Sequence, residues 1–456
     1  MVRFNTINPA TEECIAEYTF ITKKCIVESL IQSDTAQKSW VKVPIKQRVQ
    51  RLNSLGNLLL KNQEKLAILL TTEVGKPIKQ SRAEIEKCRL LCDYYCENAE
   101  TFLKAENIKT ADHLSQRTFA PLGLILGIAP WNFPFWQVFR YAIPNLMAGN
   151  GIVLKHAENV TGCALAMAHL FQEAGFIPQL FITLIVAVED VEFIISHQTI
   201  RGITLTGSAP AGAAVAMESG RALKKVVLEL GGSDPYLILD DADIAKAAHA
   251  CVTSRLNNAG QVCIAAKRIL VHKKIEHDFI DCVLELASQY ICGDPTKEET
   301  TLGPMARRDL RHILHKQVSA TIENGAECFL GGAIPEGTGF FYPATVLTRV
   351  KKDALAFKEE LFGPVICITS VNSTDEALTL ANQTPFGLGA AIFSKNIKKA
   401  QQIAEDLDVG IVAINDFVAS NPALPFGGTK QSGFGRELSS EGMREFVNIK
   451  TIMIKE

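Results

Sequence analysis

One cysteine of this sequence lies among small and amide residues, in the string Asn258-Ala259-Gly260-Gln261-Val262-Cys263. Bulky apolar side chains normally surround a buried structural thiol. A nucleophilic thiolate instead needs access for its substrate, and backbone N–H groups for the oxyanion that its attack creates. The string meets both needs, but taken alone it does not separate a nucleophile from a buried thiol.

A carboxylate that could act beside such a thiol is Glu229, in the string Val227-Leu228-Glu229-Leu230-Gly231-Gly232. The string predicts an apolar strand that ends in two glycines, where an unpaired charge costs free energy. A Glu whose pKa is raised there could serve as general base for the water that cleaves a thioester. A Glu satisfied by the backbone or by a cation such as Lys225 is the structural alternative.

An amide stands between two large aromatic residues in Ala129-Pro130-Trp131-Asn132-Phe133-Pro134. The prolines restrict the backbone, and an Asn side-chain N–H is a suitable donor to a tetrahedral oxyanion. An aromatic turn in a core is the alternative interpretation of this string.

Together and in this order, the three strings resemble the aldehyde dehydrogenase superfamily, and the resemblance covers essentially all 456 residues. It implies that Cys263 is the nucleophile, that Asn132 and the Cys263 amide form the oxyanion hole, and that Glu229 is the general base. The implied reaction forms a thiohemiacetal on Cys263, transfers a hydride to a nicotinamide cofactor and hydrolyses the resulting thioester.

The resemblance also implies a site for NAD or NADP. The turn Thr206-Gly207-Ser208 is expected beneath the pyrophosphate, where helix N–H groups face negative oxygens, although its glycine spacing alone is a weak signal. Lys155 and Glu158 are expected at the adenine ribose, and Glu360 and Phe362 at the nicotinamide ribose. The full set of matching positions is Trp131, Lys155, Glu158, Gly207, Ser208, Gly212, Leu230, Glu360 and Phe362.

Charge near the adenine ribose favours NAD over NADP. A carboxylate at Glu158 that points at the ribose repels a 2′-phosphate. Lys155 or His156 could offset this repulsion, and His156 departs from the proline that is common at that position in the family.

Arg140 points to an anionic aldehyde. It lies eight residues after Asn132, about two helical turns further along if residues 135–145 are helical, and a buried guanidinium suits a carboxylate. Arg140 and Ser420 match the carboxylate contacts of succinate-semialdehyde dehydrogenases. That group's third contact, an Arg six residues before the cysteine, is Asn257 here, so Arg255 is a candidate substitute.

Four alternatives remain open at this point. The enzyme could accept other semialdehydes or uncharged aldehydes, and Arg140 could instead form a structural ion pair. A CoA-acylating enzyme would cleave the thioester with a second thiol, which leaves less use for Glu229. A homologue without catalysis is opposed by the presence of Cys263, Glu229 and Asn132.

The elements that must position these residues follow an α/β pattern. Apolar spacing predicts helices across 35–103, interrupted at 75–77, and then alternating strands and helices, with strands near 151–154, 181–187, 202–205, 268–271 and 340–346. The family resemblance implies a Rossmann-type cofactor domain (1–103 and 123–230), an α/β catalytic domain (231–424) and a β-flap with the C-terminal strand (104–122 and 425–456). The flap implies a homodimer or homotetramer.

The amino-acid composition and the cysteine pattern argue against nucleic-acid binding, membrane association and metal binding. Lys and Arg number 47 against 49 Asp and Glu, so a net charge of -2 gives no field for nucleic acid. The polar N-terminus and interrupted apolar runs predict a cytoplasmic protein without membrane association. Cys88, Cys92 and Cys96 share one face of a predicted helix, which favours packing over metal binding, and no metal site is expected.

Overall fold

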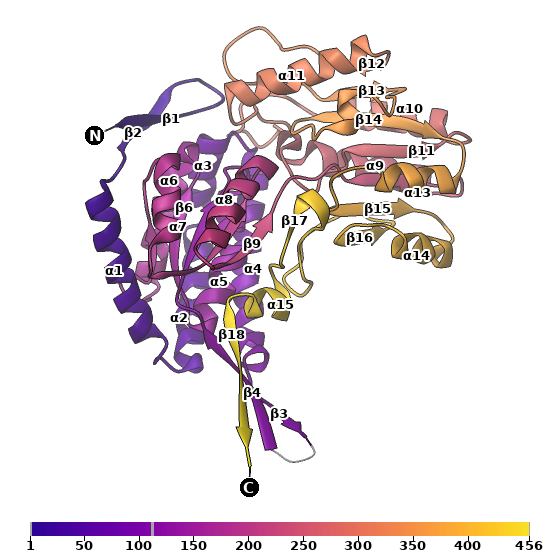
Figure 1. Cartoon of the computed structure of the whole chain (residues 1–456). Coiled ribbons are helices and arrows are strands. Elements are labelled where there is room, and N and C mark those ends of the chain that lie inside the picture. Colours follow the sequence, from indigo (N-terminus) through magenta and orange to yellow (C-terminus); the bar gives the residue numbers. More distant parts are fainter. Residues whose placement is uncertain (1, 111–113, 456) are drawn as a thin grey trace.

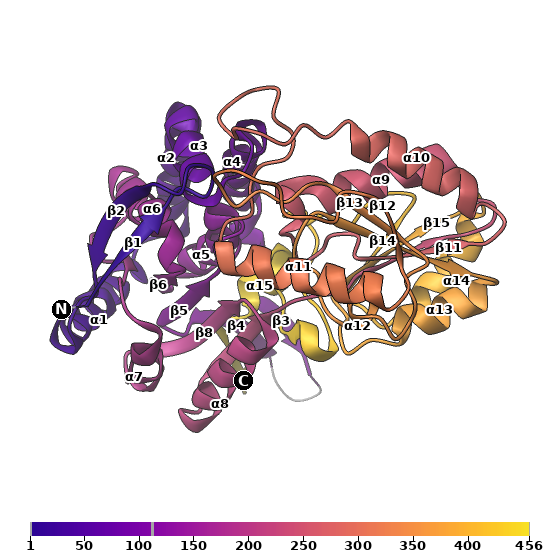
Figure 2. The ribbon, with the colours of Figure 1, turned by 90° about the horizontal axis from the view of Figure 1, so that it is seen from above.

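The computed structural model describes residues 2–110 and 114–455, which form two α/β regions and a projecting three-stranded arm (Figure 1). Seen from above, the two regions lie side by side, with the N-terminal half of the chain in one and most of the C-terminal half in the other (Figure 2). Residues near the boundary between the sheets therefore come from both halves of the sequence.

The first region is built on a six-stranded sheet. The chain runs outward from β5 to β6 and β7, then crosses back to place β8 on the other side of β5, with β9 beyond it. These five strands are parallel, and β17 joins β9 antiparallel. The reversal at β5 and β8 is the switch point where doubly wound sheets bind dinucleotides. In sheet order, the strands are β17 (Gly433–Phe434), β9 (Lys225–Glu229), β8 (Ile200–Thr206), β5 (Leu124–Ala129), β6 (Gly151–His156) and β7 (Phe181–Thr183).

Alternate residues of β5 enter two different cores. Ile125 packs with α4, α5 and α6, whereas Leu124 and Leu126 pack with α1, α7 and α8 on the other face. This is the period of two that a sheet covered on both faces requires. The helices around this sheet are α1 (Lys23–Trp40), α2 (Ile45–Lys61), α3 (Gln63–Val74), α4 (Ile78–Phe102), α5 (Pro134–Ala148), α6 (Thr161–Glu173), α7 (Val191–Ser196) and α8 (Ala209–Arg221).

The helical segment predicted across 35–103 contains parts of four helices. The predicted interruption at 75–77 is confirmed, since Gly75 ends α3 with φ of 82° and Pro77 precedes α4. Two further breaks occur at Pro44 and Asn62. The Cys88 and Cys92 side chains are fully buried on α4, as the packing interpretation predicted.

The second region has a seven-stranded sheet that is parallel except for β12. Alternate residues of its strands again enter two different cores. Leu237 of β10 packs with α11, α13 and α14, whereas its neighbours Tyr236 and Ile238 pack with α9 and α10 on the other face. The strands in order are β12 (Glu327–Leu330), β13 (Thr345–Thr348), β14 (Val365–Val371), β11 (Arg268–His272), β10 (Pro235–Ile238), β15 (Gly389–Phe393) and β16 (Ile411–Ile414). The helices are α9 (Ile244–Leu256), α10 (Glu276–Ser288), α11 (Arg308–Glu323), α12 (Leu355–Lys358), α13 (Thr374–Asn382) and α14 (Ile397–Glu405).

Two predicted strands are shorter than expected. The strand near 340–346 begins only at Thr345, after Pro343, which has no N–H to donate to a ladder. The strand near 181–187 ends at Thr183, because β7 is an edge strand that pairs only with residues 152–154 of β6.

The arm joins residues far apart in sequence. β4 (Leu114–Pro121) pairs with β3 (Glu106–Lys109) on one side and with β18 (Val447–Ile454) on the other (Figure 1). The C-terminal segment also returns to the first region, where α15 (Ser439–Arg444) packs on α5. A hairpin of β1 (Arg3–Ile7) and β2 (Cys14–Thr19) begins the chain. Among the described residues, no helix has the length and apolar character needed to span a bilayer.

Candidate active site

A strained turn carries Cys263 toward the boundary between the two sheets. Helix α9 ends at Leu256, and the next turn holds Asn258, Ala259 and Gly260 at φ of 49°, 50° and 69°. Non-glycine residues rarely adopt this conformation, and such strain concentrates at functional sites. A Cβ on Gly260 would collide with the carbonyl oxygen of Gly363, so only glycine fits there.

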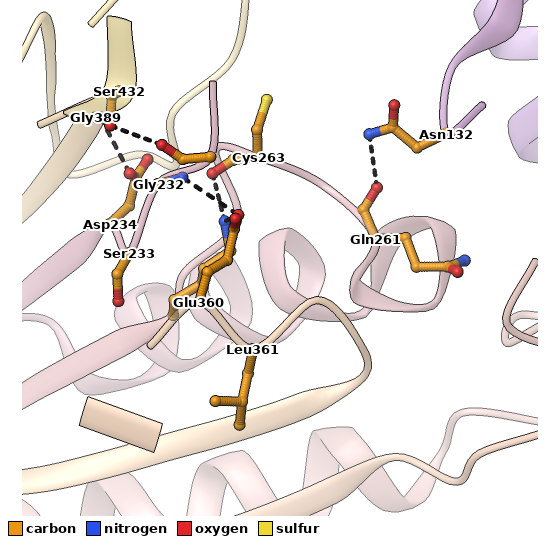
Figure 3. A network of polar contacts seen from close by, with 12 residues as sticks. Asn132, Gly232, Ser233, Asp234, Gln261, Cys263, Glu360, Leu361, Gly389 and Ser432 are labelled. Carbon is orange, nitrogen blue, oxygen red and sulfur yellow. Dashed lines mark hydrogen bonds and ion pairs between the residues drawn. The ribbon is translucent and has the colours of Figure 1, made fainter. Parts of the chain in front are cut away.

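Asn132 is tied to the loop that precedes Cys263. Its Nδ2 donates to the Gln261 carbonyl at 2.9 Å, and Asn258 Nδ2 donates to the Asn132 carbonyl at 2.8 Å. Figure 3 shows the Asn132 amide reaching this loop from a neighbouring segment. The second hydrogen of Nδ2 is left for another acceptor. The structure thus brings together two of the three strings that the sequence singled out.

The Cys263 thiol opens into a cavity of about 430 Å³. Arg140 and Ser420 line the same cavity, so the structure joins the predicted nucleophile to two of the predicted substrate contacts. Aromatic and apolar side chains form much of the wall. They are Phe133, Trp136, Val262, Ile264, Tyr290, Phe417, Val418 and Phe426.

Arg255 is not in this cavity, whereas Asn257 is. The Arg255 side chain is fully buried, and it donates to the carbonyls of Val365 at 2.6 Å and Leu361 at 2.7 Å. Two residues correspond to about 200° around a helix, so positions 255 and 257 face opposite ways at the end of α9. The structure therefore does not support Arg255 as a substrate contact, and its role is to hold α9 against Leu361 and against Val365 at the start of β14.

A cation that sequence reasoning missed lines the cavity from α4. Lys87 Nζ donates to Ser420 Oγ at 2.8 Å and lies 4.3 Å from the centroid of the Trp136 ring. The only sequence signal was its place beside the apolar face that carries Cys88 and Leu91. That signal does not distinguish it from a solvated lysine, because the partner Ser420 lies 333 residues away.

Burial raises the pKa of the Cys263 thiol to about 11, while the charges of Arg140 and Lys267 act to lower it. A thiolate at Cys263 thus depends on nearby cations. Burial lowers the pKa of Lys87 to about 8, assisted by Arg140.

Glu229 is buried next to this cavity but does not line it. Burial and the neighbouring Glu437 raise the pKa of Glu229 well above its usual value, against the opposing charges of Arg140 and Arg436. Among the described residues, neither Glu229 carboxylate oxygen has a hydrogen-bond partner. Arg140 itself is paired with Glu437, with Nε and Oε2 2.8 Å apart, and both side chains are buried.

The residues expected at the nicotinamide ribose meet beside Cys263. Glu360 accepts from the Gly232 N–H at 3.2 Å (Figure 3). It also accepts from Lys267 Nζ at 2.6 Å, and Lys267 donates to the Cys263 carbonyl at 2.5 Å. Phe362 lies edge-on to Trp131, with ring centroids 5.8 Å apart. Glu360 and Phe362 therefore both lie against Lys267, and Trp131 packs on Phe362.

The pyrophosphate residues lie at the switch point. Gly207 donates its N–H to the Glu229 carbonyl at 2.9 Å, which fixes the end of β8 against β9. Ser208 is exposed at the start of α8 and makes no capping hydrogen bond to it. A Cβ on Gly212 would lie 2.6 Å from a Leu230 methyl, so this glycine lets Leu230 pack over the helix. An uncapped helix N-terminus with an exposed hydroxyl fits a pyrophosphate.

Lys155 and Glu158 line a second cavity at the end of β6. Burial lowers the pKa of Lys155, and the carboxylates of Glu158 and Glu189 oppose this shift. His156 contributes no charge here: it is buried, its pKa falls to about 4, and its Nε2 lies 3.1 Å from the Pro134 carbonyl. The sequence suggested two cations that could compensate Glu158. Lys155 lines the same cavity as Glu158, whereas the buried His156 is neutral.

Comparison with known proteins decides the family. The sequence model of the family described as "Aldehyde dehydrogenase family" matches residues 2–452. The chain belongs to this family. An aldehyde dehydrogenase is an NAD(P)-dependent oxidoreductase, and the predicted α/β fold with its Rossmann-type sheet is confirmed by solved structures of the family.

Among similar proteins, the succinate semialdehyde dehydrogenase [NAD(P)+] Sad of Escherichia coli K12 is 44% identical, over 98% of this chain and 97% of that one. The succinate-semialdehyde dehydrogenase [NADP(+)] of Deinococcus radiodurans is 41% identical, over 98% and 94%. The solved succinic semialdehyde dehydrogenase of Streptococcus pyogenes, in complex with NADP+, has a TM-score of 0.97 and 35% identity, over 99% of this chain and all of that one.

Nothing in the described part of this aldehyde dehydrogenase groups three His, Cys, Asp or Glu residues so that they could hold a metal ion.

Proposed function

We propose that this enzyme oxidises succinate semialdehyde to succinate through a covalent intermediate on Cys263. The observation that carries the proposal is a single cavity with a thiol, a buried guanidinium and a serine hydroxyl in its wall. An aldehyde that bears a carboxylate at its other end matches this wall, and three of the similar proteins are named for that substrate.

The reaction begins when the Cys263 thiolate adds to the aldehyde carbon. Asn132 Nδ2 and the Cys263 N–H stabilise the oxyanion of the thiohemiacetal, as preorganised donors do in acyl transfer. Trp131, Glu360 and Phe362 would hold the nicotinamide end of NAD(P), which would supply the hydride acceptor for this carbon. The product is a thioester on Cys263, which leaves hydrolysis as the remaining step.

Glu229 is the proposed base for this hydrolysis. Its carboxylate must turn from Glu437 toward the thioester, and because neither oxygen is hydrogen-bonded within the described chain, no hydrogen bond opposes that rotation. The raised pKa makes the Glu229 carboxylate a stronger base than an exposed one. The proton taken from water then leaves through the neighbouring polar groups or solvent.

NAD(P) is the cofactor, and we propose that NAD is preferred. Lys155 already faces two carboxylates, Glu158 and Glu189. In the wall of the same cavity, Arg307 is paired with Asp309 and Arg308 with Glu12. A 2′-phosphate would add negative charge where the cations are already compensated.

Kinetics on paired aldehydes test the substrate. With saturating NAD, the KM for succinate semialdehyde is expected to be at least about tenfold below that for butanal, which has four carbons and no charge. Equal values for both aldehydes would contradict the proposal and favour a broad aldehyde dehydrogenase.

Replacing Arg140 sharpens this test. In Arg140→Met we expect the KM for succinate semialdehyde to rise about 10- to 100-fold, because a charged hydrogen-bond donor to the carboxylate is lost. Removing Arg140 also frees Glu437, so the butanal KM serves as the internal control. A similar rise for both aldehydes would identify Arg140 as a structural ion pair.

The arm is proposed to join subunits. Seven of the eight residues of β18 are exposed, and Ile449, Ile452, Met453 and Ile454 place apolar area at its surface. We therefore propose a homodimer or homotetramer that meets at the flap 104–122 and 425–456, next to a cofactor domain (1–103 and 123–230) and a catalytic domain (231–424). Light scattering on the purified protein measures the oligomeric state.

A cytoplasmic location remains a prediction.

A further inference from the structure

Lys87 is unusual among the charged side chains of the Cys263 cavity. Its ammonium group points at Ser420 Oγ, 2.8 Å away, and rests on the Trp136 ring. Arg140 lines the same wall from α5 and lies close enough to lower the Lys87 pKa. Two cations and a hydroxyl therefore face one space, although like charges repel each other there.

The neighbouring carboxylates do not compensate Lys87. Glu437 is engaged by Arg140. Glu84, one helical turn before Lys87, is engaged by Lys76, and it also accepts from the N–H groups of Phe135 at 2.9 Å and Trp136 at 3.1 Å. Within residues 2–110 and 114–455, no carboxylate lies at ion-pair distance from Lys87.

We infer that Lys87 binds the carboxylate of the aldehyde substrate as a third contact beside Arg140 and Ser420. Its Nζ donates to Ser420, which leaves the hydroxyl hydrogen of Ser420 for the ligand. Arg140 has a buried Nη2 without a hydrogen-bond partner among the described residues. An ammonium, a hydroxyl and a guanidinium thus meet one carboxylate.

This inference rests on the proposed function, because it assumes an anionic aldehyde. The structural alternative is that Lys87 only packs on Trp136 and holds the Ser420 loop. That alternative affects charged and uncharged aldehydes alike, whereas a carboxylate contact affects only the charged one.

The first experiment uses Lys87→Met, which keeps most of the apolar stem. We expect the KM for succinate semialdehyde to rise about 10- to 100-fold and the KM for butanal to stay within about twofold. Lys87→Arg should restore most of the loss, because it restores the charge. The matched control is Lys79→Met on the exposed side of α4, which should change neither value. An equal change for both aldehydes, or no change for either, would overturn the inference.

A pH series provides a second readout. The Lys87 pKa of about 8 means that its charge is present below pH 8 and lost above it, so the KM for succinate semialdehyde should rise above pH 8. Lys87→Arg should flatten this rise. The other groups that face Lys87 are Arg140, Glu84, Cys88 and Cys263. Cys263 titration alters the reaction of both aldehydes, so the butanal profile separates it from Lys87.

Succinate binding distinguishes failure of this inference from failure of the proposed function. Calorimetry with succinate as the probe should give a Kd about 10- to 100-fold weaker in Lys87→Met than in the wild type. A wild type that prefers succinate semialdehyde but has the same succinate Kd in both proteins would overturn the role of Lys87 and leave the proposed function intact. A wild type without this preference would overturn the proposed function, and unchanged succinate binding would then overturn the inference as well.

Discussion

The cofactor end and the substrate end of the active site differ in how their cations are paired with carboxylates. At the cofactor end, cations face carboxylates: Lys267 is paired with Glu360, and Lys155 faces Glu158 and Glu189. At the substrate end, Arg140 has one carboxylate partner, and Lys87 has none among the described residues.

This difference matches the ligands proposed for each end. A pyrophosphate can be held by the N-terminal N–H groups of α8, which need no side-chain charge. At the substrate end, the cavity wall offers the side-chain cations Arg140 and Lys87 to a carboxylate. Cys263 lies between the two ends. The following variants test whether a change at one end leaves ligand binding at the other end unchanged.

The largest effect is expected from Cys263→Ala. Activity with every aldehyde and both cofactors should fall at least about 10³-fold, because the Cys263 thiol forms the thioester. Succinate and NADH binding should persist, since the two ends remain intact. NADH absorbance and fluorescence measure these quantities, and Cys25→Ala, at an exposed cysteine, is the control. Substantial remaining activity would contradict the covalent route.

Glu229→Gln should lower kcat by about 10²- to 10⁴-fold and leave a burst of NADH, because oxidation precedes hydrolysis. The raised pKa keeps Glu229 protonated to higher pH, so wild-type hydrolysis should accelerate as pH rises through that pKa, and the variant should lose this dependence. Stopped-flow absorbance measures both phases. Undiminished turnover, or turnover that requires CoA, would favour the acylating alternative.

Glu158→Ser tests the cofactor end of the active site, where carboxylates compensate the cations. Removing one of the two carboxylates that face Lys155 should shift the ratio of kcat/KM for NADP over NAD upward by about tenfold. The KM for succinate semialdehyde should not change, because the substrate end is separate. An unchanged cofactor ratio would show that Glu158 does not face the ribose 2′ position.

The smallest effect on catalysis is expected from Arg255→Met. The change leaves two buried carbonyls without their donor, so the free energy of unfolding should fall by about 2–4 kcal/mol. The ratio of KM values for succinate semialdehyde and butanal should stay within about twofold of the wild type. Thermal denaturation and steady-state kinetics measure the two quantities, and a selective loss of succinate semialdehyde would return Arg255 to the substrate site.

Several features were predictable from local sequence. The glycine interruption before α4 and the alternation of strands and helices follow from apolar period and turn residues, which act over a few residues. The string around Cys263, together with those around Asn132 and Glu229, indicated the family because their residue types are unusual for a core. The β1–β2 hairpin and the pairing of β17 with β9 were not predicted, since neither has a local signal of its own.

By itself, the sequence determined the fold class, the family and the identity of the chemically unusual residues, because these depend on local pattern and residue type. The tertiary structure decided which cations reach the cavity. Helix rotation directs Arg255 into the core, burial leaves His156 neutral, and packing of α4 against the Ser420 loop brings in Lys87. These outcomes depend on the direction of a side chain and on partners up to 333 residues away, which no local pattern encodes.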